Sequence, residues 1–263
     1  MIFDSHAHYD DERFDGIRDD VIRDVHNNGV ARITNVSSNL GSAKSCIELS
    51  QKFDFVYAAL GVHPDSLSDM ENKDWLDILE EGYKAEKVVA IGEIGLDYYY
   101  GAEQKEEQKK CFREQMRLAQ KIGAPVIIHD REAHEDTLNI IKEFPDVFGV
   151  VHSFSGSFEF AREVMKLGYY ISVNGVVTFK NAKKIVDIIT RLRDVHEDAL
   201  SRLLVETDCP YLAPVPYRGK TNRSDYIENT AEKCAQLLEI SREEFCTLTY
   251  NNACRFYGLE VKK

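Results

Sequence analysis

The sequence has few of the features that mark membrane, disulfide-rich or DNA-coating proteins. No apolar run approaches the ~20 residues that a membrane-spanning helix needs, so no such helix is predicted. The six cysteines include no CxxC pair, which predicts reduced and mostly buried thiols rather than a disulfide framework. Basic residues number 33 against 45 acidic ones, and the net charge of −12 argues against broad coating of duplex nucleic acid.

Linkers and low-complexity segments are also missing, although 263 residues would allow either one large α/β barrel or two small domains. We therefore predict one domain over residues 1–263 and expect a monomer. The opening MIFDSHAHYDD has no basic stretch followed by an apolar one, so a secretory signal is not predicted and we expect a cytoplasmic protein.

The chain contains instead a regular alternation of short apolar runs with longer segments of helical period. Eight runs are predicted to be strands: 2–3, 31–36, 55–60, 88–91, 125–128, 147–151, 169–173 and 203–205. Nearly continuous apolar strands suit a parallel sheet that is covered on both faces. The pattern predicts an α/β fold, a single (β/α)8 TIM barrel closed by C-terminal helices at 226–238 and 242–257, with a doubly wound open sheet as the alternative.

Histidines and carboxylates follow these runs at the points where the predicted strands end. In a TIM barrel the chemistry lies at the carboxyl ends of the strands. His6 and His8 alternate along an extended strand, so both point to one side and can chelate a metal. Five of the eight histidines occupy such positions: His6, His8, His63, His129 and His152. Glu93 and Asp208 follow two further runs.

This set of ligands predicts two divalent metal ions. Four histidines and two carboxylates exceed what one tetrahedral metal needs, so two ions sharing a carboxylate is the economical arrangement. The predicted sites share Glu93 as the bridge: His6, His8 and Asp208 complete one, and His129 with His152 the other. The ligand types suit zinc and also admit magnesium or manganese.

Such a pair of ions predicts hydrolysis. A water between two cations ~3.5–4 Å apart is deprotonated near neutral pH and attacks phosphorus or a carbonyl carbon. Asp208 is predicted to orient that water and to act as the general base. The ligands do not choose between the two electrophiles. An amide or ester hydrolase, such as an aminoacyl-RNA deacylase, is therefore an alternative to a phosphodiesterase, and a non-enzymatic binding protein stabilised by metal is a further one.

Seven segments, several of them long, form a recognisable pattern in chain order: DSHAH (4–8), GVHP (61–64), GEIGLDYY (92–99), PVIIHDR (125–131), HSFSGS (152–157), ETDCPYLAP (206–214) and RGKTN (218–222). Together they resemble the TatD-type metal-dependent hydrolases, the TatD family deoxyribonucleases of the amidohydrolase superfamily. The resemblance implies a distorted TIM barrel with two divalent ions. It also implies a nuclease, typically a 3′-to-5′ exonuclease on single-stranded DNA or RNA.

Candidate substrate contacts follow from the same matching. The resemblance implies that His63 and Arg131 contact the phosphate near the metals. Arg131, Arg218 and Lys220 supply local positive charge within an acidic protein. The expected partner is therefore the end of a single nucleic-acid strand, or a small phosphodiester, at one mouth of the barrel.

The sequence does not decide the roles of two loops, at 218–224 and at 98–100. Many relatives carry Glu-Pro after R-G-K-x-N, whereas Arg223 and Ser224 follow Asn222 here, so we expect a less rigid loop. The three tyrosines at 98–100 offer rings that can stack on a base. Aromatic residues in a loop more often seal the rim of a barrel, and that is the favoured interpretation from sequence alone.

Overall fold

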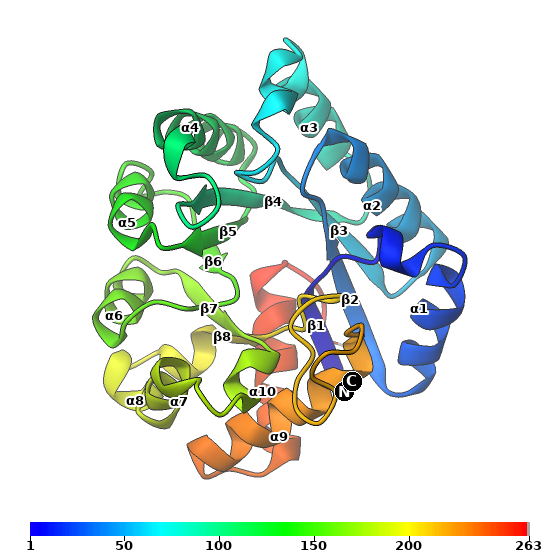
Figure 1. Cartoon of the computed structure of the whole chain (residues 1–263), viewed down its shortest axis with the longest axis vertical. Helices are drawn as coiled ribbons and strands as arrows, with labels where there is room; N and C mark the ends of the chain where they lie inside the picture. The colour runs from blue at the N-terminus through cyan, green and yellow to red at the C-terminus, as the bar shows by residue number, and fades with distance from the viewer. Residues whose placement is uncertain (262–263) are drawn as a thin grey trace. The chain divides into compact units, whose positions relative to one another are not determined.

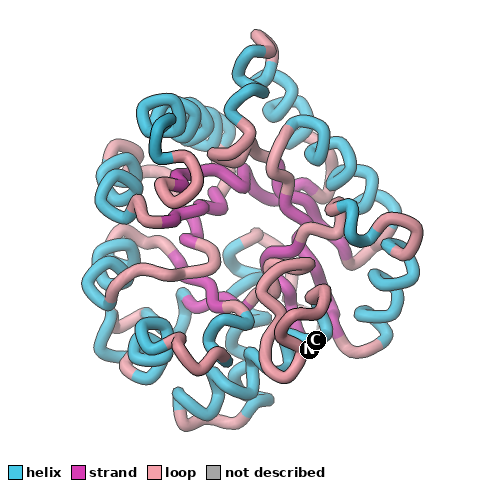
Figure 2. The backbone as a smooth tube through the Cα atoms, in the orientation of Figure 1, coloured by secondary structure: helices cyan, strands magenta, loops and turns pink. Residues whose placement is uncertain are grey.

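The structure is a computed structural model that describes residues 1–261 of the chain. Eight parallel strands follow one another in the order β1 to β8 within one sheet, with helices between successive strands (Figure 1). The tube view shows the same alternation of strands and helices along the chain (Figure 2). A doubly wound sheet would reverse its strand order partway. The fold is therefore the predicted (β/α)8 TIM-barrel class.

The observed elements match the predicted runs closely. The strands are β1 (Ile2–Ala7), β2 (Val30–Val36), β3 (Val56–Leu60), β4 (Val88–Asp97), β5 (Val126–Arg131), β6 (Gly149–Val151), β7 (Tyr170–Val173) and β8 (Leu203–Val205). The helices are α1 (Arg18–Asn27), α2 (Leu40–Lys52), α3 (Trp75–Tyr83), α4 (Lys105–Ile122), α5 (His134–Lys142), α6 (Phe158–Lys166), α7 (Lys183–Thr190), α8 (Leu192–Val195), α9 (Ile227–Leu238) and α10 (Arg242–Phe256).

Three strands continue beyond the apolar runs that predict them. β1, β4 and β5 extend through His6, Glu93 and His129, respectively. Strand pairing uses only backbone groups, so a polar side chain does not end a strand whose neighbour continues. These three candidate ligands therefore lie within strands, whereas His8, His63, His152 and Asp208 lie in the segments that follow strands.

The chain divides into two compact units. Unit 1 comprises residues 1–34, 153–166 and those from 170 onward, and unit 2 comprises residues 35–152 and 167–169. In unit 1, β7 pairs with β8 in parallel, and Ala7 at the end of β1 pairs with Cys209 after β8. In unit 2, β3 to β6 pair in parallel, and α4 packs on β4 with Phe112 and Met116 fully buried. The single-domain organisation stays a prediction.

The interior agrees with the expectations from composition. All six cysteine side chains are buried, as predicted for reduced thiols. Across residues 1–261, every helix falls short of the length and apolar character that crossing a membrane requires.

A β-bulge in unit 2 sets the direction of Glu93. Three residue steps of β4, from Ile91 to Ile94, oppose only two steps of β5, from Val126 to Ile128. The extra residue falls in the Gly92-Glu93 stretch. Bulges of this kind re-aim side chains beside active sites. Register is regular again beyond the bulge, where Gly95 lies opposite His129 and Asp97 opposite Arg131.

Gly95 is required by the close approach of these two strands, and we predict a large cost for Gly95→Ala. Its φ of +138° lies in a region that L side chains rarely adopt, and a Cβ there would overlap the carbonyl oxygen of His129. Strain and overlap together should lower the free energy of unfolding by ~2–4 kcal/mol. Urea unfolding followed by the fluorescence of Trp75, the only tryptophan in the sequence, would measure this.

The matched control is Gly123→Ala. Gly123 ends α4 with φ +69°, and a Cβ there would meet no other atom within 4 Å. Only the backbone cost of about 1 kcal/mol is expected. Equal losses in the two variants would contradict the close-approach explanation for Gly95.

Candidate metal centre

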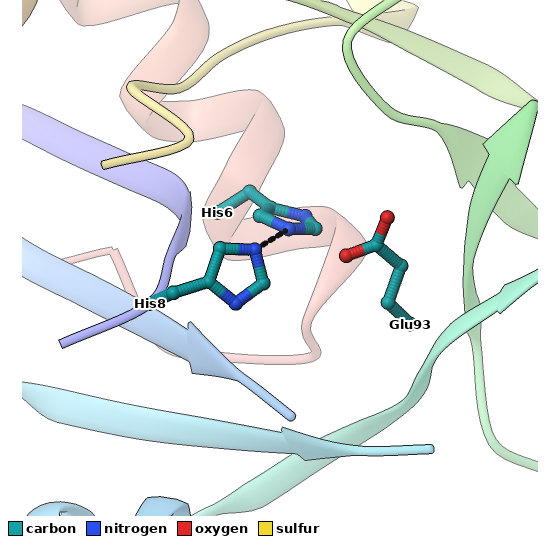
Figure 3. Close-up of side chains that lie close together, drawn as sticks. All are labelled: His6, His8 and Glu93. Atoms are coloured by element: carbon teal, nitrogen blue, oxygen red, sulfur yellow. Dashed lines mark hydrogen bonds between the residues drawn. The ribbon is translucent and has the colours of Figure 1, made fainter. Parts of the chain in front are cut away.

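Three predicted ligands converge within unit 1, and we call them the His6 cluster: His6, His8 and Asp208. The Nε2 atoms of His6 and His8 lie 3.0 Å apart, and a dashed line joins them in Figure 3. Asp208 Oδ1 lies 3.3 Å from Nε2 of His8 and 3.9 Å from Nε2 of His6. Two imidazole nitrogens and one carboxylate oxygen thus face a common point, which is the donor set that a divalent ion prefers.

Backbone pairing between β1 and the segment after β8 holds this cluster. The Asp208 N–H donates to the His6 carbonyl at 2.9 Å, and the His8 N–H donates to the Cys209 carbonyl at 2.7 Å. Asp208 itself has a φ of +57°, in the left-handed region. This conformation is more accessible to aspartate than to most other residues with a side chain.

A buried carboxylate lies beneath the cluster. Asp4 is fully buried and accepts hydrogen bonds from the N–H and the hydroxyl of Thr207, at 2.9 and 2.5 Å, and from the Ser224 hydroxyl at 2.6 Å. Burial raises the pKa of Asp4 to about 7, although these hydrogen bonds favour its charged form. Asp4 therefore ties the start of β1 to the residue that precedes Asp208.

The loop at Arg223 and Ser224 is anchored at both residues, and its lower rigidity stays a prediction. Arg223 pairs with Asp24 at 2.8 Å and with Asp225 at 2.6 Å. Besides its bond to Asp4, Ser224 donates its N–H to the Tyr9 hydroxyl at 3.0 Å. Arg223 and Ser224, which replace the Glu-Pro of many relatives, thus form ion pairs and hydrogen bonds of their own.

Four predicted residues converge within unit 2, and we call them the His129 cluster: His63, Glu93, His129 and His152. Oε1 of the Glu93 carboxylate (labelled in Figure 3) lies 2.6 Å from His152 Nε2, 2.7 Å from His129 Nδ1 and 3.6 Å from His63 Nε2. The Glu93 side chain is only 5% exposed. A buried carboxylate surrounded by three imidazoles fits a divalent ion bound by nitrogen and oxygen ligands.

Outer partners fix the orientation of two rings in the His129 cluster. His129 Nε2 contacts Asp97 Oδ2 at 3.1 Å, which leaves Nδ1 facing Glu93. His63 Nδ1 contacts Asp65 Oδ1 at 2.7 Å, which leaves its Nε2 for the cluster. A carboxylate on the far nitrogen is the usual support of a metal-binding histidine. His63 is therefore part of the cluster rather than only a turn residue.

The sequence pattern did not single out several residues that support these clusters. On α4, the Gln115 amide bonds both the N–H and the carbonyl of Val62, just before His63, at 2.8 and 2.9 Å. Gln108 similarly bonds both backbone groups of Asp97, at 2.8 and 2.9 Å. Glu206 accepts from the N–H of Ser153 and the hydroxyl of Ser172. Polar residues on an otherwise apolar helix face were the available signal for the two glutamines.

The protonation of His129 predicts that metal uptake depends on pH. Burial alone would lower the pKa of His129, but hydrogen bonds to Asp97 and Glu93 outweigh it and raise that pKa to about 9. Below about pH 9 His129 carries a proton that an incoming ion must displace. We expect the affinity of the His129 cluster for zinc to rise by up to about tenfold per pH unit up to that pH and then to level off.

Competition with a chromophoric chelator at several pH values would measure this dependence. The Asp97→Asn variant should be measured beside the wild type. Loss of the Asp97 carboxylate should lower the pKa of His129 and so weaken the dependence of zinc affinity on pH. In the metal-free protein the same pairing stabilises the fold below pH 6.5 and is lost as the pH rises through about 9. An affinity that stays constant between pH 7 and 9 would contradict the assignment.

The predicted substrate cations lie on aromatic rings. The Arg131 guanidinium is 4.3 Å from the centre of the Tyr99 ring and 4.8 Å from that of Tyr100. In unit 1, Arg218 lies 4.3 Å from the Phe179 ring and Lys220 5.6 Å from the Tyr217 ring. The neighbouring Asp130 contacts His134 at 2.7 Å.

A pocket of about 550 Å³ in unit 1 is a separate feature. It is lined by Asn28, Tyr217, Asp225, Tyr226, Glu228, Asn229, Glu232 and Arg242. Within the lining Arg242 contacts Glu228 at 3.1 Å, and Asp225 contacts Arg223, which lies outside the lining. Neither predicted cluster contributes to this lining, so we assign the chemistry to the clusters and not to this pocket.

Comparisons with known proteins agree with this donor chemistry. A family model described as TatD related DNase matches residues 3–258. The chain is 42% identical over 261 residues to YabD of Bacillus subtilis, an uncharacterised metal-dependent hydrolase, with 98% of this chain and 100% of YabD covered. It is 36% identical over 270 residues to YcfH of Escherichia coli, also an uncharacterised metal-dependent hydrolase, with 100% of this chain and 98% of YcfH covered.

A solved structure is similar over the same length. YjjV, a TatD homologue from Escherichia coli, matches with a TM-score of 0.90 and 30% sequence identity, covering 98% of each chain.

Proposed function

The chain belongs to the TatD family of metal-dependent hydrolases, and from that premise we propose that it cleaves phosphodiester bonds at the 3′ end of single-stranded DNA or RNA. The observation that carries the proposal is the pair of clusters at the carboxyl ends of strands, where TIM-barrel enzymes place their chemistry. The expected place of action is the cytoplasm.

The metal requirement follows from the donors of the two clusters. We propose that His6, His8 and Asp208 hold one divalent ion, that His129 and His152 hold a second, and that Glu93 is shared. Zinc, magnesium and manganese all suit such mixed nitrogen and oxygen donors. When bound, the two ions would polarise the phosphodiester and lower the pKa of a water molecule at the site.

The remaining steps belong to side chains of the protein. Asp208, 15% exposed and therefore able to exchange protons with solvent, takes the proton of the attacking water and passes it towards the leaving oxygen. His63, with its Nδ1 held by Asp65, has Nε2 available to donate to a phosphate oxygen bound at the His129 cluster. Arg131 places a fixed positive charge at the end of β5, where it can pair with a phosphate oxygen.

The test is a time course on a single-stranded oligonucleotide labelled at its 5′ end, with added divalent metal and an EDTA control. A ladder that shortens by one nucleotide at a time and disappears with EDTA is expected. Intact substrate under zinc, magnesium and manganese would overturn the proposal and direct attention to carbonyl substrates, beginning with aminoacylated RNA and small esters.

A further inference from the structure

Two adjacent aromatic rings are exposed directly after β4. Tyr99 is 54% exposed and Tyr100 is 70% exposed, and their ring centres lie 4.7 Å apart at nearly a right angle. Rings that seal the rim of a barrel bury their faces against it. These two do not, so the rim interpretation favoured from sequence fails for them, and a pair of exposed aromatic faces needs another explanation.

Arg131 completes this surface. Its guanidinium lies over both rings, at 4.3 and 4.8 Å from their centres, and the residue is exposed at the end of β5. A guanidinium beside aromatic rings keeps N–H groups that can donate to a phosphate. Lys105 adds a second cation beside the segment, 4.3 Å from the Tyr98 ring. In a chain of net charge −12, this local positive charge is complementary to a nucleic-acid backbone.

The segment that carries the rings is firmly held. The N–H groups of Tyr99 and Tyr100 both donate to Asp97 Oδ1 at 2.9 Å, and the Tyr98 N–H donates to the Arg131 carbonyl at 2.9 Å. The Tyr98 hydroxyl donates to Asp136 at 2.5 Å. Rings on an ordered segment lose little entropy on binding, which favours a preformed binding surface over a flexible loop.

The same carboxylate links this surface to the metal ligands. Asp97 holds the two tyrosine N–H groups with Oδ1 and contacts His129 Nε2 with Oδ2, 3.1 Å away. The rings are therefore two and three residues beyond a partner of the His129 cluster. A strand whose terminal phosphate lies at that cluster would bring a neighbouring nucleotide to the rings.

We propose that Tyr99, Tyr100 and Arg131 form a stacking platform that takes an unpaired base of the substrate strand and holds an adjacent phosphate. The inference rests on the proposed nuclease function and adds the reason for single-strand selectivity. Bases in a duplex are already stacked on each other, whereas an unpaired base has a free face for an aromatic ring. Unpaired bases and phosphates are common to single-stranded DNA and RNA, so the platform would bind either.

The test is binding of the metal-loaded full chain to fluorescent single-stranded oligonucleotides whose 3′ linkages are phosphorothioates, so that binding is read without cleavage. DNA and RNA versions are each compared with a matched strand that lacks its 3′-proximal bases. Wild-type protein should bind the intact strand at least about tenfold more tightly than the abasic one. The Tyr99→Ala/Tyr100→Ala double variant should reduce that ratio to near one.

Three further variants separate stacking from structural damage. Tyr99→Phe/Tyr100→Phe keeps both rings and should keep the preference. Phe148→Ala removes another exposed ring of unit 2, 42% exposed, and should also leave the preference unchanged. Arg131→Gln should lower the slope of log affinity against log salt by roughly 0.7, the loss of one phosphate contact on a single strand. An unchanged slope would overturn the phosphate contact.

Parallel digestion of unmodified strands keeps the two proposals distinguishable. Cleavage by wild type together with a base preference that the alanine double variant retains would overturn the platform and leave the nuclease standing. A preference that the double variant loses, with no cleavage under any metal, would support the platform and overturn the nuclease. Equal binding of intact and abasic strands by wild type would overturn the platform outright.

Discussion

The Asp208→Asn variant is expected to turn over substrate roughly two to four powers of ten more slowly while retaining most of its metal, because the variant lacks a general base. Asparagine has nearly the same shape as aspartate and keeps an oxygen where Asp208 Oδ1 lies 3.3 Å from His8 Nε2. The backbone bond from residue 208 to the His6 carbonyl is also unaffected. The amide, however, cannot accept the proton of the attacking water.

Steady-state rates across pH and metal analysis of the same preparation would test this. Asp187→Asn is the matched control, since Asp187 is exposed on α7 and pairs with Arg191 at 3.2 Å. A near-normal rate in Asp208→Asn would exclude Asp208 as the base.

Much of the fold was predictable because buried parallel strands have a strong sequence signal. Runs such as 203–205 are apolar at every position, and all three residues of β8 are buried. The ligands were predictable for a related reason. A histidine or carboxylate that ends an apolar run contrasts with it, and His129 and Glu93 are recognisable in this way even though both lie inside strands.

The supporting residues were not predictable to the same degree, because their partners lie far away in the chain. Asp4 and Ser224 are separated by 220 positions, and nothing local to either residue indicates their hydrogen bond. Gln115 fits the buried face of α4 by helical period, yet its bonds to Val62 depend on how α4 packs. The bulge at Gly92-Glu93 is likewise a property of two strands together.

The Glu93→Ala variant is expected to lose metal from both proposed sites, because the alanine removes the ligand that they would share. Its carboxylate oxygen lies within 2.7 Å of His129 Nδ1 and His152 Nε2, so the His129 cluster loses its only carboxylate. Replacing a residue that supports a metal ligand typically lowers metal affinity or activity 10–100-fold. Replacing a direct ligand should lower them by at least as much. Metal content should fall from two ions per chain to below one, with turnover reduced by more than about a hundredfold.

Elemental analysis after dialysis against a defined free-metal concentration distinguishes the possible roles of Glu93. Glu143→Ala is the matched control, because Glu143 is an exposed partner of Arg113 at 2.7 Å in the same unit, and it should retain two ions. Loss of a single ion from Glu93→Ala would assign Glu93 to the His129 cluster alone, with His6, His8 and Asp208 binding independently. Two ions retained per chain would refute the shared ligand, and the hydrolytic site would then have to be built from the histidines and Asp208 without it.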